Sequence, residues 1–141
     1  MKLRYALFCE YAQGDHMGKT NLLGVFASVN VLEVPGLIPP FFFFATFDPE
    51  DGLPASLHVR FRIAKDPQNI IIEYIGPFQA PSKPERSDTP WVFNMLLQCA
   101  GAVIREDGDY LATLEINGQS FSCPTLHVRK LDASNPVRVA N

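Results

Sequence analysis

Apolar and polar residues alternate with a period of two along several short stretches of this chain, and no other feature restricts its fold as much. In "SLHVRFRIA", one face is formed by Leu57, Val59, Phe61 and Ile63, and the other by His58, Arg60 and Arg62. Successive side chains of a β-strand point to opposite sides, so this pattern predicts a half-buried strand with a basic outer face. The opening of the chain alternates likewise, with one face formed by Leu3, Tyr5, Leu7, Cys9 and Tyr11.

A β-hairpin is predicted within "GDYLATLEINGQSFSC". Two strand-like runs flank Asn117-Gly118, a pair that readily takes the positive φ angles of a type I′ turn. Counting outward from this turn places Leu114 opposite Phe121 on one face of the hairpin.

The strand that follows the turn needs an irregularity. Leu126 and Val128 have the opposite parity from Phe121, so a regular strand would expose them. We expect a β-bulge near Ser122–Pro124 that returns them to the core, because proline commonly lies at such breaks.

Proline- and glycine-rich connections separate the predicted strands. Two of them lie at 34–40 and 48–54. A longer stretch at 76–90, "GPFQAPSKPERSDTP", holds four prolines and is predicted to be an exposed loop. Residues 91–104, "WVFNMLLQCAGAVI", fit either a strand or a buried helix.

These signals together predict an all-β fold of about eight strands with little or no helix. Evenly spaced short strands favour a two-sheet antiparallel β-sandwich of Ig-like or Greek-key type, with a barrel as the alternative. The chain has 141 residues, of which 47% are hydrophobic. We therefore expect a single domain over residues 1–141 that buries a substantial core.

Charge and hydropathy limit the kinds of partner that the chain is expected to have. The formal charge of −3 gives no reason to expect nucleic-acid binding, which normally uses a concentrated basic face. No segment reaches the ~18 consecutive apolar residues that span a bilayer, and Glu10 interrupts the apolar start too early for a signal peptide. Three widely spaced cysteines, Cys9, Cys99 and Cys123, form no disulfide framework, which favours a cytoplasmic protein with reduced thiols.

A glycine-lysine loop, "AQGDHMGKT", has some features of a phosphate-binding loop. That motif needs a glycine where this chain has Gln13, and it needs a helix after the threonine. The residues after Thr20 are strand-like instead. The segment is therefore predicted to be a hairpin loop, and Lys19 is only a weak candidate for ligand binding.

Catalytic and metal-binding motifs are lacking. Cys123 and His127 in "CPTLH" are four residues apart and would share one face of a regular strand, but two ligands are too few for a closed zinc site. There is no nucleophile elbow, and the histidines are dispersed. No catalytic residue, metal or cofactor is therefore predicted, and an enzyme based on Cys123, His127 or the glycine-lysine loop is the least favoured function.

Three segments of the chain resemble a group of small bacterial proteins that is classed only as a domain of unknown function. The segments are "ALFCEYAQGDHMGKTNLLGVFASV", "PPFFFFATF" and "DGDYLATLEINGQSFSCPTLHVRKL". The matching positions are Cys9 to Ala12, Gly18-Lys19, Asn21 to Gly24, Gly108 to Tyr110, and Pro124 with Leu126 and Val128. The resemblance covers almost the whole chain; it implies a β-sandwich and no catalytic residue.

The phenylalanine run "FFFFATF", residues 41–47, motivates the leading functional hypothesis. Parity places Phe42 and Phe44 on the face opposite the one that serves the core. If they are exposed, they form an interface for self-association or for a protein partner, which would make the protein a non-enzymatic interaction module. The alternative is that the 76–90 loop, which contains Phe78, covers them.

A second hypothesis is a sandwich that binds a small ligand or a carbohydrate. Trp91, Tyr74 and Tyr110 are the candidate stacking platforms, together with the loops around them. Each of these aromatic residues is also a candidate for the core.

Overall fold

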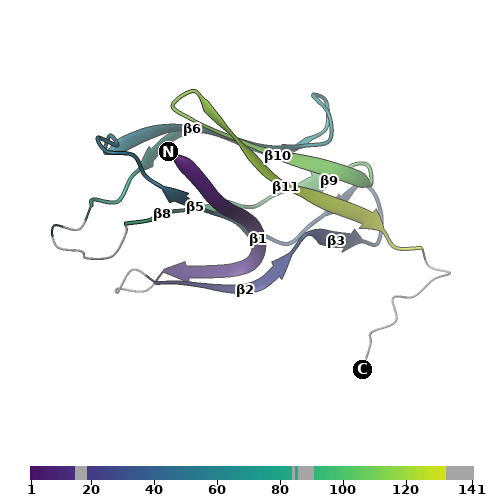
Figure 1. Ribbon diagram of the computed structural model, residues 1–141. Coiled ribbons are helices and arrows are strands. Elements are labelled where there is room, and N and C mark those ends of the chain that lie inside the picture. Colours follow the sequence, from purple (N-terminus) through teal and green to yellow (C-terminus); the bar gives the residue numbers. More distant parts are fainter. Residues whose placement is uncertain (15–18, 84, 86–90, 133–141) are drawn as a thin grey trace.

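The computed structural model describes residues 1–14, 19–83, 85 and 91–132, and this part of the chain contains strands and no helix (Figure 1). Its strands are β1 (Lys2–Gly14), β2 (Thr20–Phe26), β3 (Ser28–Val31), β4 (Gly36–Leu37), β5 (Phe41–Asp48), β6 (Ser56–Ala64), β7 (Ile70–Gln79), β8 (Phe93–Cys99), β9 (Val103–Ile104), β10 (Gly108–Ile116) and β11 (Gln119–Lys130). The prediction of an all-β fold is confirmed.

The strands form three sheets. A four-stranded sheet has the order β2-β1-β5-β8, a five-stranded sheet has the order β3-β11-β10-β6-β7, and β4 pairs with β9. The described residues form eleven strands where about eight were predicted, and β3 runs parallel to β11, so the arrangement is not clearly the predicted two-sheet antiparallel sandwich of Ig-like type. The run that follows the glycine-lysine loop breaks at Ala27, so that β2 belongs to one sheet and β3 to the other.

The two larger sheets pack against each other over a common core. The rings of Phe43 and Phe61 lie 4.4 Å apart between their centroids, and those of Phe47 and Phe121 lie 5.2 Å apart. Each pair joins the four-stranded sheet to the five-stranded one. Aromatic contacts of this kind add to the stabilisation that comes from burying apolar area.

The predictions for the last hairpin are confirmed. Asn117 and Gly118 have φ angles of 48° and 84°, as a type I′ turn requires. The register of β10 and β11 shifts at Cys123–Pro124, which is the predicted bulge. Beyond the bulge, Leu126 and Val128 are buried.

One segment differs from its prediction, and another settles an alternative that the sequence left open. Residues 76–79 belong to β7 instead of an exposed loop, because Pro77 lies in an edge strand, where a missing N–H costs little. Residues 91–104 contain β8 and β9, which decides between strand and helix in favour of strand.

The four-stranded sheet is strongly curled. β1 bends near its middle, and its second half runs back with β2 past β5 and β8 (Figure 1). Thr20 and Asn94 belong to the opposite edges of this sheet, yet the Asn94 amide lies 3.5 Å from the Thr20 hydroxyl. The pairing of β1 with β5 is irregular between Leu3 and Tyr5, and Leu3 packs against the core. The prediction that Leu3 and Tyr5 share one face is therefore wrong.

Candidate functional site

The phenylalanine run forms β5 and divides between two faces as its parity predicts. Phe41, Phe43 and Phe47 belong to the main core, and Phe42 and Phe44 contact the outward-facing rings of Tyr11 and Tyr5 instead. Phe44 is only 2% exposed, and Phe42 is half-buried. The run itself therefore offers little free surface, contrary to the hypothesis that both side chains are exposed.

The 76–90 segment, with Phe78, was the alternative cover for Phe42 and Phe44, but Phe78 packs elsewhere. Phe78 pairs with Leu57 and packs edge-on against Phe93, with ring centroids 5.8 Å apart, at the main core. The contacts to Phe42 and Phe44 come from the curled strand β1. Its Tyr11 ring lies 6.4 Å from that of Phe42, and its Tyr5 ring lies 6.0 Å from that of Phe44.

Exposed apolar side chains gather on the β1–β2 hairpin. Leu23 is 63% exposed, Val25 is 60% exposed and Tyr11 is 48% exposed. Tyr11 pairs with Leu23, while Val25 pairs with Cys9, the neighbour of Phe42. We call Tyr11, Leu23 and Val25 the β2 face.

The strand that carries most of the β2 face lies at the edge of its sheet. β2 pairs with β1 on one side, and no described strand pairs with its other side. Its seven residues, "TNLLGVF", include no charged side chain and no proline. Natural edge strands usually carry such residues because these oppose pairing with another chain.

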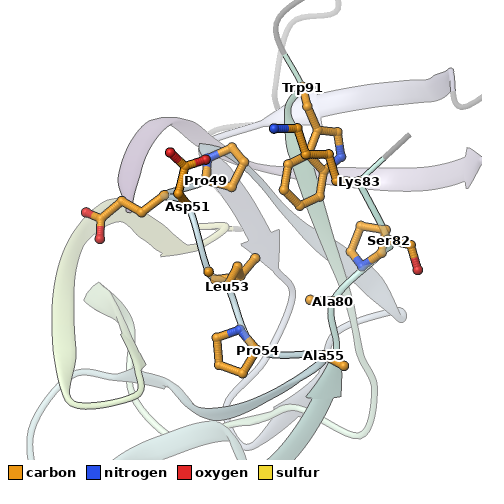
Figure 2. A pocket seen from close by; sticks show the side chains of 12 residues that line it. Pro49, Asp51, Leu53, Pro54, Ala55, Ala80, Ser82, Lys83 and Trp91 are labelled. Carbon is orange, nitrogen blue, oxygen red and sulfur yellow. The ribbon is translucent and has the colours of Figure 1, made fainter. Parts of the chain in front are cut away.

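A second surface feature is a pocket of about 430 Å³ around Trp91 (Figure 2). Its walls come from the connection between β5 and β6, from the residues after β7 and from Trp91, two residues before β8. Polar and apolar side chains mix in the lining, which consists of Pro49, Glu50, Asp51, Gly52, Leu53, Pro54, Ala55, Ala80, Pro81, Ser82, Lys83 and Trp91. Of the three predicted stacking residues, Trp91 is the one that lines this pocket, and its side chain is half-buried.

The two candidate tyrosines lie away from the Trp91 pocket. Tyr110 is fully buried, and its hydroxyl donates a hydrogen bond to the Glu106 carbonyl at 2.6 Å. Burial also raises the pKa of Tyr110. Because its ring is enclosed, Tyr110 cannot be the platform that the sequence suggested. Tyr74 is 37% exposed on β7 and donates to the Pro77 carbonyl.

Tyr74 borders an open cleft of about 610 Å³ between the edge strands of the two larger sheets. The lining of this cleft includes Ile72, Leu97 and Cys99. Burial raises the pKa of Cys99 to about 12, so its thiol is protonated at neutral pH and is a poor nucleophile. This position therefore suits a small core residue better than a catalytic one.

The glycine-lysine loop joins two antiparallel strands, as predicted. Gly14 at the end of β1 pairs with Thr20 at the start of β2. Lys19 is exposed and precedes a strand, so the helix that a phosphate-binding loop requires does not follow it. Residues 15–18 of this loop lie outside the described residues.

The bulge in β11 separates Cys123 from His127. Cys123 packs against the core, where burial raises its pKa to about 11, while His127 lies on the outer face with Asp109. The two side chains therefore do not share a face as a regular strand would require. Among the described residues, no group of three His, Cys, Asp or Glu side chains could hold a metal ion.

His127 has an acidic neighbour that the sequence did not reveal. Its Nδ1 lies 2.6 Å from an Asp109 carboxylate oxygen, and its paired residue on β3 is Ser28. A serine, a histidine and an acid on adjacent strands have the order of a hydrolase triad. However, the Asp109 side chain is 73% exposed, and although the structure describes all three residues, no hydrogen bond joins Ser28 to His127. We assign this cluster no catalytic role.

The fold and these surfaces define an all-β protein with an apolar edge strand and a loop-lined pocket. The chain belongs to the family of unknown function DUF6941, which it matches over residues 4–129. This finding agrees with the resemblance seen in the sequence. No curated protein and no solved structure matches the chain. The described residues include no helix that is long and apolar enough to cross a membrane.

Proposed function

We propose that the protein is a non-enzymatic interaction module that self-associates through the β2 face. The observation that carries this proposal is the exposure of Tyr11, Leu23 and Val25 on or beside an edge strand without charge. Aromatic side chains bury about 150–250 Å² each, so this patch and the half-buried Phe42 approach the few hundred Å² that mark an interaction site.

A second copy of the chain fits this surface well. Two β2 strands can pair antiparallel about a two-fold axis, which joins their sheets into one and satisfies the backbone groups at both edges. Because "TNLLGVF" is uncharged, the pairing brings no like charges together. The exposed side chains of the two copies are apolar and therefore complementary to each other.

The experiment compares two matched lysine substitutions by analytical ultracentrifugation at protein concentrations from about 1 to 100 µM. The wild type is expected to be dimeric at the upper end. Leu23→Lys should shift the protein to monomer, because a charge on an edge strand opposes pairing. Leu111→Lys is the control, since Leu111 is 52% exposed on the five-stranded sheet and should leave the dimer unchanged.

Two results would contradict self-association through this face. One is a wild type that stays monomeric over the whole concentration range. The other is a folded Leu23→Lys, Val25→Lys double variant that dimerises as the wild type does. Circular dichroism of each variant verifies that the fold is retained.

A further inference from the structure

The pocket around Trp91 is separate from the β2 face, and its residues share a common frame. Pro49, Pro54 and Pro81 lie in its walls and fix the φ angle of the backbone at three points. The Ala80 amide donates a hydrogen bond to the Ala55 carbonyl at 2.8 Å, which ties the two connections together. A site held in this way is largely formed before a ligand arrives.

The pocket has an apolar floor and an aromatic wall. Leu53 and Ala80 are partly buried and pack against the main core. Figure 2 shows Asp51 and Leu53 on one segment of the chain, with Trp91 and Ala80 across from them. A flat ring that enters the pocket can therefore lay one face on the indole while its edge remains within reach of polar groups.

The polar groups of the pocket have both signs of charge. Lys83 and Asp51 both line the pocket and lie on different segments, across from each other in Figure 2. Glu50 is engaged by the amino group of Met1, and Ser82 adds a hydroxyl to the lining. Two acids, of which Glu50 is paired with Met1, one base and one hydroxyl offer donors and acceptors without a strong field of either sign.

We infer that this pocket binds a neutral sugar ring. A pyranose has an apolar face of C–H groups that stacks on tryptophan and a rim of hydroxyls that bond to carboxylate, ammonium and hydroxyl groups. A purely apolar ligand that covers the exposed Asp51 and Lys83 would remove them from water without bonding to them, and a charged ligand of either sign would meet one group of its own sign. The volume of about 430 Å³ accommodates one ring with bound water.

The chain carries its own reporter for this site, because Trp91 is its single tryptophan. The experiment titrates the full chain with glucose, galactose, mannose and N-acetylglucosamine while the tryptophan fluorescence is recorded. We expect a saturable change in intensity or wavelength for at least one of these sugars. Gluconate, which is an open-chain anion, should give no saturable change.

Two variants tie the signal to the pocket. Asp51→Asn keeps the tryptophan and should weaken sugar binding about tenfold, because it removes a charged acceptor. Asp107→Asn is the matched control, since Asp107 lies in the exposed turn before β10, outside the pocket. If Asp51→Asn disturbs the fold, Ser82→Ala tests the opposite wall of the pocket and should also weaken binding.

The inference is overturned if none of the four sugars gives a saturable change, or if Asp51→Asn and Ser82→Ala both bind as the wild type does. A response to gluconate of the same strength would also overturn it. The fluorescence titration measures sugar binding and not self-association. A failure of the sugar site therefore leaves the proposal for the β2 face unaffected, and the reverse also holds.

Discussion

At the scale of single residues, the phenylalanine run shows how much parity can predict. The alternation correctly placed Phe41, Phe43 and Phe47 on the core side of β5, because side chains of a strand must alternate. It could not show that the Tyr5 ring contacts Phe44, because this contact depends on the pairing of β1 with β5, two strands far apart in the sequence. The exposed apolar residues near the run include Tyr11, Leu23 and Val25, which the parity of the run does not indicate.

The burial of Phe44 gives a prediction about stability. Phe44→Ala should lower the free energy of unfolding by about 3–5 kcal/mol, because it leaves a cavity in a closed site. Phe42→Ala should cost clearly less, since the Phe42 side chain is already in partial contact with water. Urea denaturation followed by circular dichroism measures both values. Equal losses for the two variants would contradict the difference in burial.

At the scale of elements, local turn chemistry was the most predictable part of the structure. The Asn117-Gly118 turn and the bulge at Cys123–Pro124 follow from backbone preferences and parity, which need no tertiary information. The parallel strand β3 was missed for the opposite reason. The sequence around Ala27 is continuous and apolar, and nothing local indicates that the chain changes sheets there.

The turn supports a prediction at this scale. Gly118→Ala should destabilise the protein by about 1 kcal/mol, because Gly118 has a φ of 84°, which an L-residue adopts at a cost. Gly14→Ala should be nearly neutral, since a Cβ there meets nothing within 4 Å and the residue has no positive φ. Thermal unfolding of the two variants provides the comparison. A neutral Gly118→Ala would mean that the turn relaxes without loss.

At the scale of the whole molecule, the sequence indicated the class of fold but not its arrangement. Alternation in β6 and β10 predicts that each strand buries one face. The buried side chains of both strands belong to the same core. The order of the strands depends on contacts between segments far apart in the chain. The same is true of the connections that meet around the Trp91 pocket. No local pattern encodes these contacts, so Trp91 was found as an aromatic residue and not as part of a pocket.

Self-association has a consequence for thermal unfolding of the whole molecule. If folded chains pair and unfolded chains do not, the melting temperature should rise with protein concentration, by about 2 °C for a tenfold increase. Differential scanning calorimetry at two concentrations measures this shift. Leu23→Lys should abolish the concentration dependence, whereas Leu111→Lys should retain it.

The passage of the chain through Ala27 also determines how the molecule can deform. On that side a single residue connects β2 of one sheet to β3 of the other, so a short stretch of backbone holds these two edges together. On the far side, β7 and β8 face each other across a cleft, and no described backbone hydrogen bond bridges them. Widening the molecule there would separate side-chain contacts such as the one between the Phe78 and Phe93 rings, whereas widening it at Ala27 would strain a continuous backbone.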